Sequence, residues 1–575
     1  MNKKLICLLL SVLMLLSVVL TSCGKKSDDD VLEDITEEAS AATVTLSMYL
    51  MSEAPVSAEQ EAAIENALNV LTKAKYKVKM DLTFLTPDVY YTALEENLKK
   101  QSENADLYYT EENTAEPETE KDELGIETLK YPALKPNQVD IFYLSGYDKY
   151  STYAQKDYLN LLNEEVDGDA KALKSYITPK LLEYMKTANE GIYAIPSNRA
   201  IGNYTYLLLN KDVLAATYHD VSYSDFSSLT SADVQDILAY VNASDLKNQY
   251  VPLHSFTGEI DVLNYEYWGK GSNGSLSSQF SVLGGAIDLS WEHGAQDSYP
   301  RINNIFLDEA YTSQLKVLGS YKRNGYYDAA AVANGKDFAV GYIKGNAKDV
   351  AKYSEDYEIV TVATPTLYTQ DLYQDMFAVS AYTVSLSRSM DIITYLNTDE
   401  EVRNLLAYGI EGENYELVET EKNGETYKQV KLLNNSYNMD VNKTGNILLA
   451  YTTVDQDPML REYAKEQNRD MKVAYNIGFQ LDYDDMTLHE AYFEQVRVLS
   501  EQIFAEMMAK DPAEWTDEYI ASLNTRVNKE RCVAYMCNST MTPDSPLGEG
   551  YYSLQAIYSV WLEDTGLYIP PVEPD

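Results

Sequence analysis

The stretch TVTLSMYLMSEAPVSAEQEAAIENALNVLTKAKYKVKMDLTFLTPDVYYTALEENLKK, residues 43–100, decides the fold class of this chain. Apolar and polar residues alternate at its start and again from Val78 onward, which is the period of a β-strand. Between these runs, Ser57 precedes apolar residues at helical spacing, and Gln60 follows three positions later as in a capping box. A second helical run begins at Thr86 with proline in its first turn. The pattern predicts strand, helix, strand and helix at residues 43–50, 57–75, 78–84 and 86–98, the opening of a doubly wound α/β sheet.

A third strand is predicted at Val139–Leu144. Gly146, Tyr147 and Asp148 would then form the loop at its carboxyl end, where open α/β sheets bind their ligands. Before this strand, residues 103–123 carry nine acidic residues and one basic residue without an apolar face. We therefore expect a surface insertion at 103–137 that is flexible in its first half.

Helical periodicity and strand-like runs continue to the end of the chain. Further helices are predicted at 231–241, 308–324, 388–397, 399–406, 457–467, 488–509 and 517–528. Further strands are predicted at 204–209, 357–362, 377–380 and 446–451.

The first residues have the layout of a secretory signal. Two lysines precede the apolar run Leu5–Leu20, and the string Leu-Thr-Ser-Cys-Gly ends at Gly24. This string resembles the lipobox of bacterial lipoproteins, which implies cleavage after Ser22 and acylation of Cys23, with palmitate as one such acyl chain. An ordinary signal peptide with an incidental cysteine is the alternative. Residues 23–42 are acidic and small and are expected to form a tether to the membrane surface.

Charge and composition limit the possible partners. Removing residues 1–22, which hold two lysines and no acid, changes the formal charge from −44 to −46. Such a charge repels nucleic acid and anionic lipid, so both are poor partners. The 50 tyrosines, against 11 phenylalanines, indicate either a compositional habit or a surface that stacks on polar ligands.

Metal, cofactor and catalytic motifs give no support for an enzyme. The G-x-G-x-x-G string at 269–274 lacks a strand-to-helix context, so a loop is expected there. Residues 163–174 imitate a calcium loop, but Lys174 stands where a bidentate Glu is needed. Cys532 and Cys537 lie five residues apart, a poor spacing for a disulfide, and are expected to be unbridged. No metal and no cofactor is predicted.

Three strings together resemble a known family. Residues 139–162 contain VDIFYL and YAQKDYLNLL, residues 191–214 contain GIYAIPSN and LNKDVL, and residues 407–415 read AYGIEGENY. In this order they are similar to the extracellular solute-binding lipoproteins of ABC importers, family 1, the class that includes maltose-binding protein. The resemblance covers most of 43–480.

The resemblance implies an α/β fold of the type II periplasmic-binding-protein class, a two-lobe clamp with hinge crossings between the lobes. Lobe one would comprise 43–200 with 372–408, and lobe two 201–365 with 409–570. The crossings would fall near 198–204, 365–377 and 408–415, where Gly409 and Gly412 allow backbone rotation. The 103–137 insertion departs from the family and would lie next to the ligand-facing edge of lobe one.

The resemblance also implies ligand-binding positions, namely Glu53, Tyr147, Asp148, Asn198, Arg199, Trp268, Trp291 and Tyr342. Aromatic rings suit the apolar faces of sugars, and acids, amides and Arg suit their hydroxyls. Alternatives stay open for several of them. The two tryptophans fill the core, Arg199 pairs with a surface acid, Asp148 caps a helix, or Glu53 lies in the helix-entry loop without touching ligand.

The function implied is that of a lipid-anchored solute-binding protein on the extracytoplasmic face of the cell membrane. It would deliver a small polar ligand, a sugar or oligosaccharide, to an ABC transporter permease. Two alternatives remain: a tethered secreted carbohydrate-active enzyme, and a ligand-sensing subunit for a membrane receptor.

Overall fold

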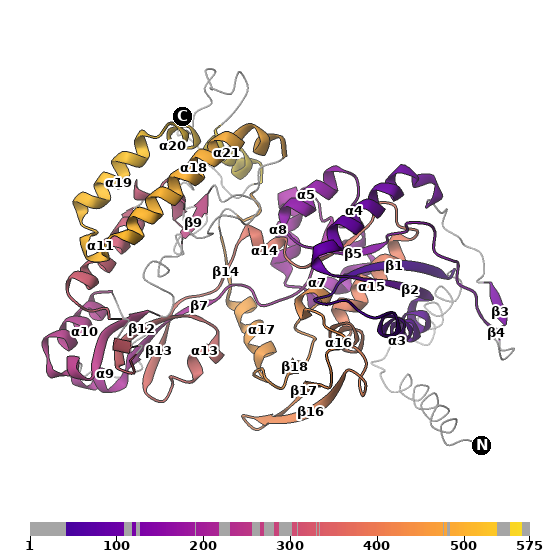
Figure 1. Cartoon of the computed structure of the whole chain (residues 1–575), viewed down its shortest axis with the longest axis horizontal. Coiled ribbons are helices and arrows are strands. Elements are labelled where there is room, and N and C mark those ends of the chain that lie inside the picture. Colours follow the sequence, from indigo (N-terminus) through magenta and orange to yellow (C-terminus); the bar gives the residue numbers. More distant parts are fainter. Residues whose placement is uncertain are drawn as a thin grey trace, which may run out of the picture.

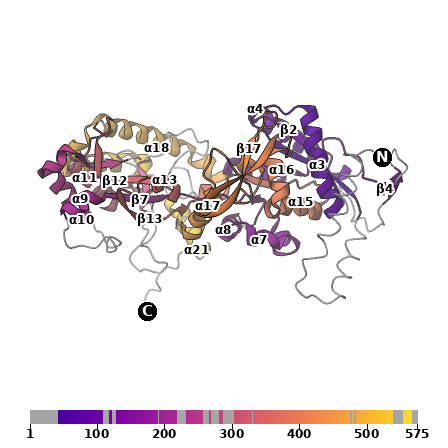
Figure 2. The ribbon, with the colours of Figure 1, turned by 90° about the horizontal axis from the view of Figure 1, so that it is seen from below.

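The computed structural model describes residues 42–108, 118–121, 127–189, 191–217, 231–255, 265–268, 281–286, 302–307, 309–328, 331–332, 334–474, 477–479, 483–537 and 553–565. Two α/β halves lie side by side, the N-terminal half at the right of Figure 1 and the other at the left. Figure 2 shows the same separation from below, with the helix α17 between the halves. Among the described residues, no helix combines the length and apolar character of a membrane span.

The first sheet has the strand order β2-β1-β5-β15-β6. β1 pairs in parallel with β2 and β5, and β15 runs antiparallel between β5 and β6. The strands are β1 (Val44–Met51), β2 (Val78–Leu85), β5 (Ile141–Leu144), β6 (Ala194–Pro196) and β15 (Met376–Val379). The predicted strands of residues 43–144 are therefore confirmed, in a parallel arrangement.

Helices bury apolar stripes against this sheet. Ile64 and Leu68 of α3 and Leu94 of α4 are fully buried, and each buried Leu or Ile side chain contributes roughly 1.5–3 kcal/mol. Ser57 accepts the Gln60 amide at the start of α3, which confirms the predicted cap. The helices are α3 (Ala58–Tyr76), α4 (Pro87–Glu103), α5 (Tyr147–Gln155), α6 (Asn163–Asp167), α7 (Leu173–Tyr176), α8 (Pro179–Asn189), α15 (Leu386–Thr398) and α16 (Glu400–Tyr408), with the 3₁₀ turn η2 (Asp169–Ala172).

The insertion lies at the amino end of the first sheet, opposite the edge where the prediction placed it. Its described parts are η1 (Ala105–Leu107) and the hairpin β3 (Thr119–Lys121) and β4 (Glu127–Leu129). At the start of β1, Thr43 Oγ1 donates to the Lys130 carbonyl at 2.6 Å and Thr45 Oγ1 to the Pro132 carbonyl at 2.5 Å. The topology explains this placement, because α4 runs from the carboxyl edge of β2 back to the amino edge, where the chain then enters β5. Residues 109–117 and 122–126, which hold most of the predicted flexible half, lie outside the described residues.

The second sheet has the order β13-β7-β12-β8. β12 is parallel to β8 and antiparallel to β7, so β12 ends at Gly345 opposite Tyr204, where β7 begins. The carboxyl ends of β8 and β12 therefore lie on the side where the chain arrives from the first half. The elements are β7 (Tyr204–Asn210), β8 (Tyr250–Ser255), β12 (Asp337–Gly345), β13 (Tyr357–Ala363), α9 (Lys211–Thr217), α10 (Ser231–Ala243), η4 (Asp245–Asn248) and α13 (Ala347–Ala351).

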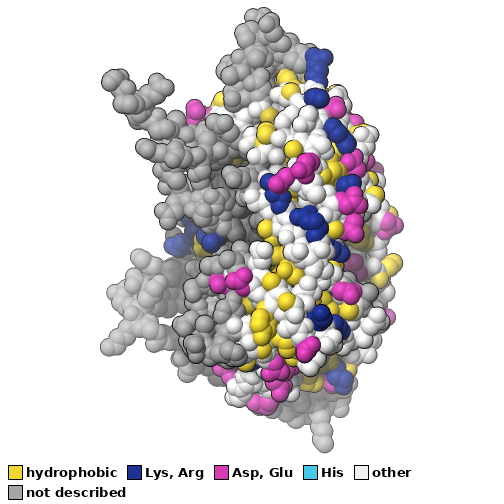
Figure 3. All heavy atoms as spheres, turned by 90° about the vertical axis from the view of Figure 1, so that its left-hand side faces the viewer, with side chains coloured by type: hydrophobic (Ala, Val, Ile, Leu, Met, Phe, Trp, Pro, Cys, Tyr) yellow, Lys and Arg dark blue, Asp and Glu magenta, His cyan; other side chains and the backbone are white. Residues whose placement is uncertain are grey.

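A helical unit at the C-terminal end shares a long helix with the second sheet. α11 (Glu309–Arg323) places Tyr311 and Leu315 in the core of this unit and Tyr321 in the core of the sheet. Cys532 and Cys537 are free thiols here, which confirms the unbridged state. The other elements are β9 (Tyr265–Trp268), β10 (Leu283–Ala286), β11 (Asn303–Asn304), η5 (Ile305–Leu307), α18 (Tyr483–Ala509), η7 (Pro512–Glu514), α19 (Asp517–Lys529), α20 (Arg531–Met536) and α21 (Leu554–Asp564). On the outer face of this half, basic and acidic side chains are interspersed (Figure 3).

A third, small sheet packs with the first half. It is built from β16 (Tyr415–Lys422), β17 (Glu425–Leu432) and β18 (Thr452–Thr453). The Gln60 and Asn414 side chains exchange hydrogen bonds of 3.3 and 3.0 Å, and Tyr437 and Met439 lie in the core of the first sheet. This packing differs from the predicted division, which assigned 409–570 to lobe two. Residues 446–451, predicted as a strand, form turns after η6 (Val441–Thr444).

Three connections join the two halves. Residues 197–203 join β6 to β7, and residues 364–375, with β14 (Thr366–Leu367) and α14 (Thr369–Leu372), join β13 to β15. After α17 (Leu460–Asp470), β19 (Lys472–Val473) pairs with β14, and the chain passes from Ile477 in the first core to Phe479 in the C-terminal core. The third crossing thus lies near 474–479 and not at 408–415. Gly409, with φ +87°, ends α16 instead, and it packs against the Asn414 side chain.

Candidate functional site

A row of polar residues lies along one edge of the first sheet. Ser52 follows β1, Ser145 follows β5, Asp375 precedes the antiparallel strand β15, and Ser197 follows β6. Parallel strands end at the same edge, and an antiparallel strand begins there, so these four residues belong to adjacent strands. We call Ser52, Ser145, Asp375 and Ser197 the polar row. It occupies the carboxyl edge, where open α/β sheets bind ligands.

Two hydroxyls of the polar row are buried without a partner. Ser52 is 0% exposed and Ser197 is 2% exposed, and neither Oγ has a hydrogen-bond partner. Buried polar groups are nearly always bonded, and an unmet one costs roughly 1–3 kcal/mol. These two hydroxyls are therefore suited to bond a polar molecule.

Asp375 is held in a strained conformation by the rest of the row. Its backbone has φ +51°, its amide donates to Ser145 Oγ at 3.3 Å, and its carbonyl accepts the Ser197 amide at 2.8 Å. Its carboxylate accepts the Tyr143 hydroxyl at 2.6 Å. Burial raises the pKa of the Asp375 carboxyl above its ordinary value, against the opposing effect of that hydrogen bond. Non-glycine residues in left-handed backbone are uncommon and recur at functional sites.

Tyrosines flank the row. The Tyr91 hydroxyl accepts the Ser145 amide at 3.1 Å, and burial raises the Tyr91 pKa to about 12. Tyr147, in the first turn of α5, packs edge-on against Tyr373 with 4.9 Å between ring centroids. Tyr91 and Tyr147 are both half-buried, and aromatic rings of this kind suit the apolar face of a sugar.

Two ion pairs lie next to the polar row and join segments that are far apart in the chain. Lys443 Nζ lies 2.5 Å from Glu53 Oε1, and Arg199 Nη2 lies 3.1 Å from Asp371 Oδ1. Arg199 and Lys443 also act electrostatically on Asp375. Glu53 and Lys443 are 390 positions apart, and the pair brings the turn after β1 to the 3₁₀ turn η6.

The structure places the predicted site residues unequally. Glu53, Tyr147 and Asp148 lie beside the polar row, in the loop after β1 and the first turn of α5. Asp148 is not the helix cap, because Gly146 occupies that position. Tyr342 lies on β12 opposite Ser255, three residues before the end of the strand, and burial raises its pKa. Of Trp268 only the backbone in β9 is described, and Trp291 and Cys23 lie outside the described residues.

Asn198 and Arg199 lie in the first crossing. The buried Asn198 amide donates to the Tyr176 carbonyl at 2.9 Å and accepts from Thr178 Oγ1 at 2.8 Å. Arg199 donates to both the carbonyl and the carboxylate of Asp371 in the second crossing. Asn198 therefore ties the first crossing to lobe one, and Arg199 ties the first crossing to the second. Arg199 thus pairs with an acid, but that acid, Asp371, is buried and not the surface acid of the predicted alternative.

Sequence reasoning missed Ser145, Ser197, Asp375 and Lys443. For Ser145 a usable signal was its place directly after the predicted strand Val139–Leu144, whereas the strand before Ser197, β6, was not predicted. Asp375 and Lys443 reach this edge only through pairings between segments far apart in the chain, which local patterns do not report.

Comparison with known proteins agrees with this architecture. No protein-family model matches the chain. The N-glycan transport solute-binding protein NgtS of Streptococcus pneumoniae superposes with a TM-score of 0.53 at 19% identity, covering 91% of this chain and all of that one. The chain has the fold of an extracellular solute-binding protein. A "carbohydrate ABC transporter substrate-binding protein" of the same species is 22% identical over 356 residues, 59% of this chain and 67% of that protein. An extracellular solute-binding protein of Bifidobacterium longum subsp. infantis covers 92% of this chain at 15% identity, with a TM-score of 0.46.

The solute-binding fold confirms the resemblance inferred from the three strings, with its two α/β halves and three connections. The carboxyl ends of β8 and β12 lie on the side of the crossings, and the first crossing begins at Ser197 of the polar row. Ser255 and Tyr342 stand near that edge of the second sheet.

Proposed function

We propose that this chain is an extracytoplasmic solute-binding protein that binds a carbohydrate and delivers it to an ABC transporter permease. The observation that carries the proposal is the pair of buried, unpartnered hydroxyls of Ser52 and Ser197 at the carboxyl edge of the first sheet. A sugar hydroxyl both donates and accepts, so it meets the needs of such groups. The name of the 22% identical relative supports the carbohydrate class.

The ligand would contact both halves. From the first half we propose Glu53, Tyr147 and Asp148, together with the polar row. From the second half we propose Tyr342, Trp268 and Trp291. Asn198 and Arg199 would shape the hinge on which the halves close, and contact between ligand and Arg199 would depend on that closure.

The membrane attachment is a separate proposal. We propose that Cys23 is acylated after cleavage of the signal, and that residues 23–42 tether the protein to the extracytoplasmic face of the membrane. The proposed protein binds its ligand without chemical change, so the glycan should be recovered intact after prolonged incubation with the purified chain.

The test of function is a melting-temperature screen against sugars and peptides, followed by titration of each hit. A ligand at 100 times its Kd should stabilise the fold by about 2.7 kcal/mol. Ser197→Ala should weaken binding of a carbohydrate hit, while Ser244→Ala, at the start of η4 in the second half, should not. The proposal fails if peptides bind and no carbohydrate does, or if an added glycan is cleaved.

A further inference from the structure

The charged groups around the polar row are predominantly acidic. Among the described residues, Asp375 responds electrostatically to Arg199, Lys443 and Asp440. Both of these cations already contact a carboxylate: Lys443 contacts Glu53 at 2.5 Å, and Arg199 contacts Asp371 at 3.1 Å. The cations are thereby neutralised locally, and Asp375 and Asp440 leave an excess of negative charge.

A third cation nearby does not reverse this balance. Lys149, in α5, lies over the Tyr91 ring with its ammonium 5.1 Å from the centroid and over Tyr153 at 5.7 Å. Its neighbour in the chain, Asp148, carries the opposite charge at the same end of that helix.

Burial makes the acidic excess effective. The Arg199–Asp371 pair has side chains only 13% and 12% exposed, and Asp375 is half-buried. Salt and water screen charges poorly at such positions, so a second negative charge brought to the row would be repelled. The unpartnered hydroxyls of Ser52 and Ser197, in contrast, bond neutral hydroxyl groups without any charge penalty.

We infer that the polar row selects uncharged glycans and rejects glycans that carry a carboxylate, sulfate or phosphate, with Asp375 as the specificity-determining residue. The inference rests on the proposed function, whose ligand class it narrows. Asp375 accepts the Tyr143 hydroxyl on Oδ1, which holds its carboxylate in the row.

The test uses matched pairs of glycans and the full chain. The probes are a mannose oligosaccharide with and without a terminal phosphate, and an N-acetyllactosamine oligosaccharide with and without sialic acid. Each is titrated by calorimetry against wild type, Asp375→Asn and the control Asp517→Asn. Asparagine tolerates the left-handed backbone of position 375, so this variant should fold, and a thermal melt verifies it. Asp517 lies in α19, in the C-terminal unit, and its substitution makes the same change in net charge.

We expect the neutral member of a pair to bind wild type at least about tenfold more tightly at low salt. The ratio of the two affinities should fall in Asp375→Asn and should persist in Asp517→Asn. Equal or tighter binding of the charged member by wild type overturns the inference and leaves the proposed function standing, as does an unchanged ratio in Asp375→Asn. If no glycan of either kind binds, the proposed function fails and the inference fails with it.

Discussion

Arg403→Lys should destabilise the protein strongly, although it keeps the positive charge. Arg403 is 0% exposed on α16, and its guanidinium holds the loop that carries Lys443. Nε donates to the Asn446 carbonyl at 2.9 Å, Nη1 to Thr444 Oγ1 at 2.6 Å, and Nη2 to the Val441 carbonyl. Burial lowers the pKa of Arg403 to about 10, so the fold already bears the cost of desolvating this cation.

The magnitude follows from the bonds that lysine cannot replace. A single ammonium nitrogen does not span three acceptors fixed around a planar fork, so at least two of the three hydrogen bonds to the cation would be lost. Each hydrogen bond to a charged group contributes roughly 1.5–3 kcal/mol, so the free energy of unfolding should fall by about 3–5 kcal/mol. Urea denaturation followed by circular dichroism measures this loss.

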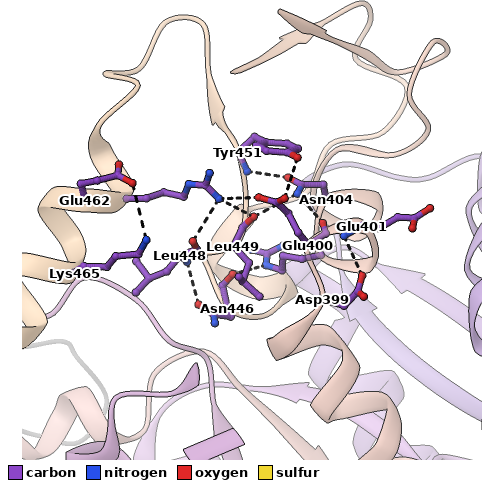
Figure 4. Close-up of polar contacts among 12 residues, drawn as sticks. Asp399, Glu400, Glu401, Asn404, Asn446, Leu448, Leu449, Tyr451, Glu462 and Lys465 are labelled. Atoms are coloured by element: carbon purple, nitrogen blue, oxygen red, sulfur yellow. Dashed lines mark hydrogen bonds and ion pairs between the residues drawn. The ribbon is translucent and has the colours of Figure 1, made fainter. Parts of the chain in front are cut away.

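Arg461→Lys, in α17, is the matched control, because Arg461 holds the next part of the same connection. Arg461 donates to the Leu449 carbonyl and to Glu400 Oε1, both at 3.1 Å. Glu400 also accepts the Tyr451 hydroxyl at 3.1 Å, as Figure 4 shows. Glu400 is 46% exposed, so this network is screened, and the loss should stay within about 1 kcal/mol. Equal losses in the two variants, or a loss under about 1 kcal/mol for Arg403→Lys, would refute the reasoning.

Three further predictions concern other groups. Asp140→Asn should lower stability by about 2–4 kcal/mol in urea denaturation, because an amide nitrogen replaces an oxygen that accepts either the Ser47 amide or the Val384 amide; an unchanged midpoint would contradict this. Asp375 has a folded-state pKa above its ordinary 3.8, so the fold binds its proton more tightly than the unfolded chain does. Wild type should therefore gain stability relative to Asp375→Asn as the pH falls through that raised pKa towards 3.8, and parallel pH profiles would argue against it. Cys23→Ala should abolish incorporation of a fatty-acid probe, and label retained by the variant would exclude Cys23 as the acylation site.

The start of the fold could be predicted because its signals are local. Strand alternation, the Ser57 cap and the proline of α4 each act within a few residues, and they fixed the order of β1, α3, β2 and α4. The third crossing was misplaced for a related reason. A glycine with positive φ can end a helix or act as a hinge, and the sequence does not distinguish the two. Here Gly409 ends α16.

Long-range pairing explains the remaining misses. The apolar run 446–451 resembled a strand. Its backbone bonds to the first crossing instead, because the Ile447 amide donates to the Asn198 carbonyl at 2.9 Å. Asp375 enters the site because β15 inserts antiparallel between β5 and β6. Lys443 reaches the site because Arg403 holds the backbone segment around it by hydrogen bonds to Thr444 and Asn446. Neither contact produces a recurring residue spacing, so a single sequence does not reveal it.

The same long-range contacts determine how the two halves can move. Asn468 of α17 donates to the Arg199 carbonyl at 2.7 Å and accepts the Ile201 amide at 3.0 Å, so α17 holds the backbone of the first crossing. Two residues on, Asp470 accepts the Tyr204 hydroxyl at the start of β7. Gly202, with φ +62°, packs so closely on Thr366 that a Cβ there would lie 2.9 Å from its amide nitrogen. α17 is hydrogen-bonded to the first crossing, and the second crossing packs against the first. These three segments therefore form one unit. Closure of the halves would then bend the chain at the ends of these segments.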